Sequence, residues 1–314
     1  LQLLGSRLAN ESGIEASAAK PVQLRYNGVN RADDNQNTRR YGSYLHLEPI
    51  DGDWADEHFP LDSGGNVYSK GRPDVKWDIR TTGDGAANAN AYRSDGWSKN
   101  SNESIDDWED LHQFMVTING ASGDDYLEQV SNVIDVEQWT RWFAYMTIVL
   151  SRETNLGNGT DDDYKFYGGV IDPRFKLIPH DFDTIFGLGD TRTGPTDSIF
   201  PAITNFAGQR MPQLDRFFND PTILRLYYSN LRNLLETVFS KARFDAAVTN
   251  SLDWLPADSD VEDDVIDFMD TRRSYILSQI PSEFTVSSSL SSSEGFLRTD
   301  DAGVTGLDGT IDPT

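Results

Sequence analysis

Cysteine is absent from all 314 residues of the chain. A disulfide framework, a thiolate nucleophile and a cysteine-ligated metal site are therefore excluded. Basic residues are scarce as well, since 27 Lys and Arg stand against 51 Asp and Glu, for a formal net charge of −24. This balance argues against nucleic acid as a partner, because phosphate backbones are bound by basic surfaces. It fits a chain that stays dissolved by self-repulsion and holds divalent cations.

Long hydrophobic runs and the common hydrolase motifs are also missing. The longest apolar run, Phe143 to Leu150, is too short to span a bilayer. Only 4 histidines occur, and none of them forms an HExxH pair. The Gly-x-Ser-x-Gly pattern is absent too, which removes the usual signal of a serine hydrolase.

The length of the chain predicts more than one structural unit. Leucines at helical spacing predict a helix over 1–12, and alternating patterns predict strands over 21–26 and 41–48. We expect residues 1–50 to form a small unit, 51–282 a larger and mostly helical one, and 283–314 a Ser/Gly/Asp-rich linker or tail. The start at Leu1 suggests a piece of a longer protein that further domains flank.

Within the larger unit, residues 49–103 are acidic and rich in Gly, Asn and Ser, which predicts a surface excursion with short strands near 66–70 and 75–79. Ser104 with Asp107 resembles a capping box for a helix that Gly120 closes. Asp135 opens the most apolar helix, which we expect to be central and buried. Two further helices are predicted after Asp220 and over 261–281.

The segment 174–190 organises the rest of the chain. A short strand, Phe175 to Ile178, is followed by Pro179 and then by His180-Asp181-Phe182-Asp183. Because buried carboxylates are unfavourable without a partner, such a pair usually meets a cation or a network of donors. An EF-hand is excluded, since Ile185 and Phe186 occupy positions that need an oxygen ligand and a glycine. His180 is either a general base or ligand, or a structural hydrogen-bonding residue.

A helix, a polar loop at 151–163, a β-hairpin and then Asp-Phe-Asp follow one another in the sequence. Phosphoryl transfer requires one carboxylate that orients the attacking hydroxyl and others that hold Mg²⁺ against the nucleotide phosphates. The alternative for the run 161–163 is a solvated loop. The candidate residues are Glu153, Asn155, Asn158, Asp162, Asp163, Asp181 and Asp183.

At these positions the chain resembles the CotH-like kinases, atypical secreted relatives of protein kinases named after a spore coat protein. The resemblance is carried by LIPHDFDTIFG (177–187), DYKFYGG (163–169) and YGSYLHLEPID (41–51). GGNVYSKG (64–71) and NESIDDWEDL (102–111) support it, and it covers about residues 1–281. It implies an α+β, atypical protein-kinase-like fold with two lobes, in which the small lobe is incomplete and a β-hairpin lies at the active site of the large lobe.

The resemblance also implies roles for single residues. Asp181 takes the place of the metal-binding aspartate of the kinase DFG motif, with Asp163 or Asn158 as further ligands and Asp183 assisting the metal or bracing its loop. Glu153 lies nearest to the place of the catalytic aspartate. Glu48 lies near the segment that joins the lobes, beside the adenine. Lys70 or Lys76 is a candidate contact for phosphate, the alternative being a lysine on the surface.

From these residues we expect a bacterial, secreted or cell-surface kinase domain. It would transfer the γ-phosphoryl group of ATP to Ser or Thr hydroxyls of an extracytoplasmic protein with Mg²⁺, or with Mn²⁺ or Ca²⁺ in its place. Glutamate at 153 and the phosphate-binding lysine expected upstream of Leu1 depart from the family pattern. They favour an alternative, a non-catalytic adhesion module of the same fold with an acidic, Ca²⁺-binding cluster. A third interpretation is a structural domain that acidic loops keep soluble.

Overall fold

The computed structural model of the protein describes residues 1–30, 44–71, 77–151, 164–189, 194–200, 211–252, 260–281, 284–286 and 311–313. They form a mixture of helices and strands, which confirms the predicted α+β class. The helices are α1 (Gln2–Glu11), α2 (Gly52–His58), α3 (Ala89–Ser94), α4 (Glu109–Gly120), α5 (Tyr126–Ser131), α6 (Val136–Val149), α7 (Pro212–Asn219), α8 (Pro221–Glu236), α9 (Lys241–Leu252) and α10 (Val261–Gln279). The strands are β1 (Ala19–Val22), β2 (Arg25–Tyr26), β3 (Val29–Asn30), β4 (Tyr44–Leu47), β5 (Asn66–Lys70), β6 (Trp97–Lys99), β7 (Tyr164–Gly168), β8 (Lys176–Pro179), β9 (Phe284–Val286) and β10 (Ile311–Pro313).

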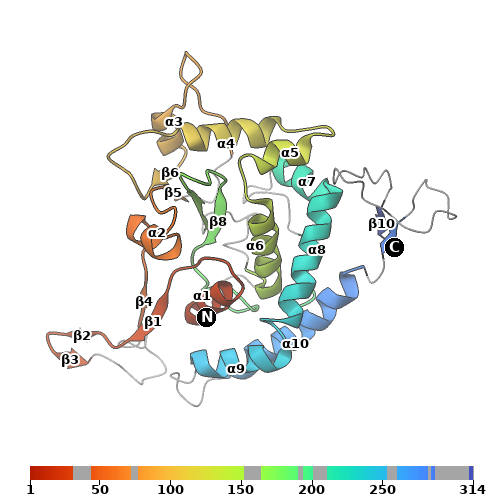
Figure 1. The fold of residues 1–314 in the computed structure, drawn as a ribbon. Coiled ribbons are helices and arrows are strands. Elements are labelled where there is room, and N and C mark those ends of the chain that lie inside the picture. The colour runs from red at the N-terminus through yellow and green to blue at the C-terminus, as the bar shows by residue number, and fades with distance from the viewer. Residues whose placement is uncertain are drawn as a thin grey trace.

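A four-stranded antiparallel sheet with the order β6-β5-β7-β8 lies beside α6 (Figure 1). Tyr68 of β5 pairs with Phe166 of β7, which in turn pairs with Leu177 of β8. These three side chains are buried in the large core that the sheet shares with α6. Because side chains alternate between the two faces of a strand, their neighbours in sequence point to the other face.

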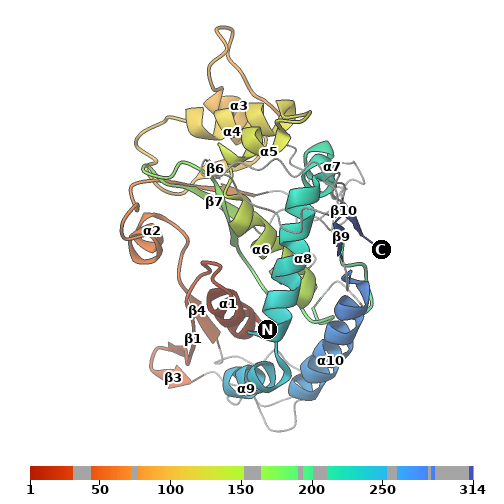
Figure 2. The same ribbon diagram turned by 45° about the vertical axis from the view of Figure 1, so that its right-hand side comes forward.

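The outer face of the sheet carries a second and smaller core. Trp54 of α2 is buried there with Val67, Tyr167 and Ile178 from three neighbouring strands. Figure 2 shows α2 on the side of the sheet away from α6 and α8. The sheet therefore separates two hydrophobic clusters of very different size.

Helix α6 is the buried centre of the larger core, as the sequence predicts. The side chain of Asp135 accepts a hydrogen bond from the backbone N–H of Gln138 at 3.2 Å, so the predicted cap is confirmed. The indole of Trp139 donates to the Phe175 carbonyl at 2.8 Å and stacks on Phe166 with ring centroids 5.9 Å apart. Helix α8 lies along its other side (Figure 1). The predicted Asp220 cap of α8 is confirmed too, since its carboxylate accepts from two backbone N–H groups.

The expectation of a surface excursion over 49–103 is wrong, although the short strand expected near 66–70 is confirmed as β5. The strand expected near 75–79 is not formed by its described residues 77–79. The segment 49–103 supplies β5, a central strand of the sheet, together with α2, α3 and β6. Trp54, Trp77, Tyr92 and Trp97 within it are buried. The large aromatic residues outweigh the polar composition, because each removes much apolar surface from water.

The cap predicted at Ser104 is wrong as well, since α4 begins at Glu109. The backbone N–H of Glu109 instead bonds the carboxylate of Asp107 at 3.0 Å.

Asp62 fastens the turn between β7 and β8. Its carboxylate accepts hydrogen bonds from the backbone N–H groups of Val170 at 2.8 Å, Ile171 at 2.8 Å and Asp172 at 2.9 Å. Burial alone would raise the pKa of Asp62, but these three donors outweigh it and lower the pKa. A Cβ atom at Gly169 would lie only 1.9 Å from the Asp62 carboxylate, so a larger residue there would displace the carboxylate from its donors. The hairpin predicted over 164–178 is thus confirmed and held at its tip.

The first residues of the chain form α1 and the antiparallel pair of β1 with β4. Leu4 and Leu8 of α1 are buried in the large core, whereas β1 to β4 extend away from the body of the molecule in Figures 1 and 2. The division at residue 50 and the linker over 283–314 stay predictions, and residues 287–310 lie outside the described part. None of the helices in the described ranges is both long and apolar enough to cross a membrane.

Candidate functional site

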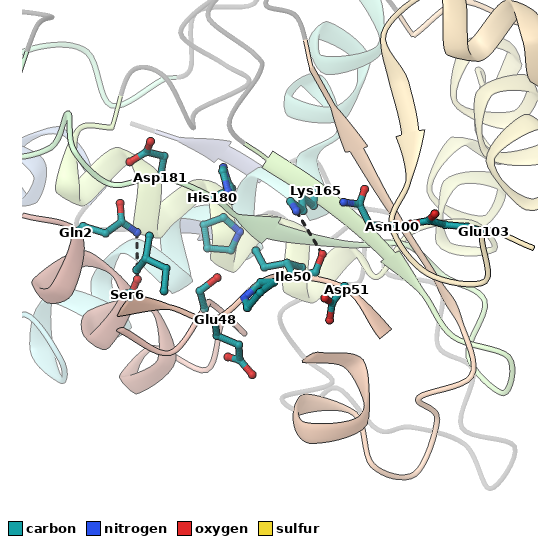
Figure 3. Close-up of a pocket in the computed structure, with 14 residues that line it drawn as sticks. Gln2, Ser6, Glu48, Ile50, Asp51, Asn100, Glu103, Lys165, His180 and Asp181 are labelled. Carbon is teal, nitrogen blue, oxygen red and sulfur yellow. Dashed lines mark hydrogen bonds between the residues drawn. The ribbon is translucent and has the colours of Figure 1, made fainter. Parts of the chain in front are cut away.

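A cavity of about 440 Å³ opens on the outer side of the sheet. Its walls come from α1, from the segment that follows β4, from β7 and from the end of β8 (Figure 3). The volume lies in the range of pockets that bind small molecules. Most of the polar side chains that line it are acidic or amide-bearing, namely Gln2, Glu48, Asp51, Asn100, Glu103 and Asp181. The others are Ser6, Ser17, Lys165 and His180.

Asp181 lies at one end of this cavity, directly after β8. Its backbone φ of 60° places it in the left-handed region, which aspartate tolerates better than most residues. The carboxylate accepts a hydrogen bond from the N–H of Asp183 at 3.3 Å. The next N–H, that of Phe182, donates to the side chain of Gln2. The loop after β8 is therefore attached to α1 immediately beside Asp181.

Phe182 anchors the same loop through its ring. The side chain is 1% exposed and packs against Gly5 of α1, where an added Cβ atom would lie 2.6 Å from the Phe182 Cβ. Tyr145 of α6 donates to the Gly5 carbonyl at 2.7 Å, and its ring centroid lies 6.0 Å from that of Phe182. Helix α1 can come this close only because residue 5 is a glycine.

The far end of the loop is attached to α6. The N–H of Phe186 donates to the Val149 carbonyl at 2.8 Å, where α6 ends in the left-handed Leu150. The buried guanidinium of Arg272 binds the Thr147 carbonyl at 2.8 Å. The same guanidinium binds the Pro195 carbonyl at 3.1 Å. The loop that carries Asp181 thus lies beside the point where α6 leads into residues 152–163.

Glu48 lines the cavity, but its carboxylate is engaged within the fold. The carboxylate accepts from the Ala18 N–H at 2.9 Å and contacts Nε2 of His58 at 3.0 Å. Burial acts to raise the pKa of Glu48, and these two partners outweigh it and lower the pKa. The N–H of Glu48 also donates to the Ala18 carbonyl at 2.9 Å. A ligand that bound the Glu48 carboxylate would therefore compete with Ala18 and His58 for it.

Lys70 does not line the cavity. Its neighbour Ser69 pairs with Lys165 across β5 and β7, so Lys70 points to the opposite face of the sheet. There it is 5% exposed, with Nζ 5.5 Å from the ring centroid of Tyr164 and 5.9 Å from that of Trp97. The alternative of a surface lysine is wrong, and the predicted phosphate contact gains no support from this position. Lys76 lies outside the described residues.

Asp183 does not line the cavity either. Its side chain is exposed and accepts from the Thr184 hydroxyl at 3.1 Å. Of the two roles predicted for Asp183, this hydrogen bond is the kind expected of a residue that braces the loop.

Lys165 is a cavity residue that the sequence analysis did not single out. It lies on β7, and its Nζ donates to the Ile50 carbonyl at 3.3 Å (Figure 3). Burial lowers the pKa of Lys165, and the nearby carboxylate of Asp51 opposes the shift. The alternation in Tyr164-Lys165-Phe166 could have identified Lys165, because a lysine between two core aromatic residues of a strand must point to the other face of the sheet.

The remaining candidates lie outside the described residues, so their roles stay predictions: Glu153, Asn155, Asn158, Asp162 and Asp163. Among the residues that are described, no three His, Asp or Glu side chains meet to hold a metal ion. Mg²⁺ is usually bound by one or two carboxylates together with substrate phosphates and water. One partly buried carboxylate, that of Asp181, at the end of a ligand-sized cavity fits the protein's share of such a site.

A comparison with protein families agrees with this geometry. The family model described as CotH kinase protein matches residues 4–274, which is most of the chain. The match begins within α1 and includes the whole four-stranded sheet and the cavity residues Glu48, Lys165 and Asp181. None of the curated proteins compared with the chain matches it.

Proposed function

The chain belongs to the CotH kinase protein family, and on that premise we propose that it transfers the γ-phosphoryl group of ATP to a Ser or Thr hydroxyl of a protein. Membership implies a kinase-like domain that uses a nucleotide, a divalent metal and a protein substrate in general terms. The observation that carries the proposal is the cavity, which has Asp181 at one end and the segment 48–51 along its wall. A nucleotide bound there would have a metal-binding carboxylate beside its phosphates.

The proposed architecture has two lobes that meet at this cavity. We assign α1 and the β1–β4 pair to the remainder of a small lobe, and the sheet with α4 to α10 to the large lobe. The segment 48–51 would connect the two. The attachment of Phe182 to Gly5 supports this division, because it would link the metal loop of one lobe to the helix of the other.

Catalysis would consist of positioning and of charge stabilisation, as in other phosphoryl transfers. Bound Mg²⁺–ATP supplies the phosphoryl group and neutralises the charge on its oxygens. Asp181 would hold the metal, with Asp163 or Asn158 as a second oxygen donor. Glu153 would orient the acceptor hydroxyl and accept its proton, since a glutamate carboxylate can act as a base.

Mn²⁺ or Ca²⁺ would be the alternative metals, because both also take oxygen ligands. We propose a bacterial protein that acts outside the cytoplasm, either secreted or on the cell surface, on an extracytoplasmic protein substrate. The strongly acidic composition, at a net charge of −24, supports neutralisation of the site by cations.

Asp181→Asn tests the metal assignment. Asparagine shares the tolerance of aspartate for the left-handed backbone, so the fold should persist while the charge is lost. We expect Mg²⁺-dependent transfer of radiolabel from ATP to protein to disappear, with an unchanged circular dichroism spectrum. Asp124→Asn, at an exposed site without a hydrogen-bond partner among the described residues, is the matched control. Undiminished transfer by Asp181→Asn would show that the carboxylate does not hold the metal.

The second candidate is a non-catalytic adhesion module of the same fold, favoured by the glutamate at position 153. An adhesin of this kind should show no change in melting temperature with ATP and Mg²⁺. A thermal shift by ATP that requires Mg²⁺ would exclude it, and a shift by Ca²⁺ alone would favour it.

A further inference from the structure

The ammonium group of Lys165 is incompletely satisfied in the fold. A lysine carries three N–H donors, and among the described residues this one makes a single hydrogen bond, to the Ile50 carbonyl at 3.3 Å. No carboxylate among the described residues lies within 4.0 Å of it. Because a partly buried ammonium is unfavourable without acceptors, the two remaining donors are left for water or for a ligand in the cavity.

The other lysines near the sheet differ in this respect. Lys99 donates to the carbonyls of Ile105 at 3.1 Å and Asp107 at 2.8 Å. Lys176 is paired with Asp172 at 3.1 Å and Asp135 at 3.7 Å. The carboxylate of Asp51 in the cavity wall acts on the pKa of Lys165, and it already accepts the N–H groups that begin α2. Lys165 is thus the described lysine that is placed to serve a ligand here.

The position of Lys165 separates it from the predicted metal site. It pairs with Ile178 across β7 and β8, and Asp181 follows Ile178 by three residues. That spacing corresponds to roughly 10 Å of extended chain. Figure 3 shows Asp181 and Gln2 at one end of the cavity, Asn100 and Glu103 at the other, and Lys165 between them, next to Ile50 and Asp51. Phosphates held near Asp181 would leave Lys165 for another part of the nucleotide.

We propose that Lys165 recognises the base of the bound nucleotide, by donating a charge-assisted hydrogen bond to an acceptor atom of the ring. The inference rests on the proposed function and names the residue that selects its nucleotide. Glu103 and Asp51 on the same side carry negative charge, which would repel a phosphate. A purine instead offers ring acceptors to the lysine and exocyclic N–H donors to Glu103. On binding, Lys165 gains the acceptor that the fold does not supply.

The test is calorimetric titration of the full chain with three probes: Mg²⁺–ATP, adenosine, and Mg²⁺ with inorganic tripolyphosphate. A hydrogen bond that involves a charged group supports at least about a tenfold difference in affinity. We therefore expect Lys165→Met to lower the affinity for ATP and for adenosine about tenfold and to leave the affinity for tripolyphosphate unchanged. Lys165→Gln, which keeps a neutral donor, should recover part of the loss. Lys20→Met removes a charge at an exposed site and should bind all three probes like the wild type.

Each outcome decides between distinct ideas. If Lys165→Met lowered the affinities for ATP and tripolyphosphate equally, the lysine would contact phosphate, and the proposal of base recognition would be overturned. If Lys165→Met bound ATP and adenosine with wild-type affinity, Lys165 would make no energetically important contact with the nucleotide. If the wild type bound none of the probes, the proposed function itself would fail. Melting curves of both variants establish that they are folded, and we expect no loss of stability, since each removes a partly buried charge.

Discussion

Replacement of Asp62 by alanine should loosen the β7–β8 turn in a measurable way. The change removes three hydrogen bonds of 2.8 to 2.9 Å from the carboxylate to the N–H groups of Val170, Ile171 and Asp172. These donors lie near the surface and can turn to water, so each bond contributes less than a buried one, or about 0.7 kcal/mol. We therefore expect a loss of about 2 kcal/mol in the free energy of unfolding, or ~5 °C in Tm.

The pH dependence sharpens this prediction. The pKa of Asp62 is lowered in the folded protein, so its contribution is complete above the unfolded value of about 3.9 and is lost as the pH falls through the folded value. Urea unfolding followed by circular dichroism should give the same difference between wild type and Asp62→Ala at pH 7 and at pH 5.5. Below pH 4 the difference should shrink, and the two proteins should converge once the pH is below the folded pKa of Asp62.

Two variants control this experiment. Asp62→Asn keeps an acceptor oxygen without the charge and should lie between wild type and Asp62→Ala. Asp124→Ala should change the free energy of unfolding by no more than about 0.5 kcal/mol, as exposed substitutions usually do. If the difference in free energy of unfolding between wild type and Asp62→Ala grew on acidification, the charged carboxylate of Asp62 would not be what stabilises the turn. Nucleotide binding should not change, because the turn lies at the end of the hairpin away from Asp181.

Two further predictions concern packing at a distance from the cavity. Gly65→Ala would place a Cβ atom 2.1 Å from the Gly168 carbonyl and push β5 from β7. We expect the free energy of unfolding to fall by about 2 kcal/mol. Urea unfolding measures this loss, and Gly83→Ala, where the added Cβ meets open space, is the control. Arg272→Lys keeps the charge but cannot reproduce the fork that binds the Thr147 and Pro195 carbonyls. A loss of about 2 kcal/mol is expected, and a loss no larger than that of the exposed Arg225→Lys would contradict the role of the fork.

The parts of the fold that were predicted correctly are those with a strong local pattern. The helix that begins at Asp135 and the hairpin before Asp181 each carry a cap or a turn within a few residues of a periodic apolar stretch. Strand β5 was misplaced at the surface, because its neighbour β7 lies about a hundred residues further along the chain. No local pattern shows that the two strands pair.

Strand pairing, which no local pattern shows, also explains why Lys70 was predicted to contact the nucleotide although Lys165 lines the cavity. A strand position has two faces, and a shift of one residue exchanges them. Because Ser69 pairs with Lys165, Lys165 and Lys70 point to opposite faces of the sheet. This register becomes known only with the fold. Asp181 and Glu48 both line the cavity, although more than a hundred residues separate them in the sequence. The engagement of the Glu48 carboxylate by Ala18 and His58 depends on contacts across chain segments that composition does not encode.

The unequal size of the two hydrophobic clusters has a consequence for how the molecule opens. The small cluster under α2 holds Ile50, Trp54, Ala55, Val67, Tyr167 and Ile178, with Phe59 at its edge. Segments with few buried apolar contacts open with less free energy than the global unfolding of a domain. One wall of the cavity, around Ile50 and Asp51, belongs to this segment. A ligand that binds only the closed form would hold α2 in place by mass action, so that occupancy of the cavity and local folding of α2 form a single linked equilibrium.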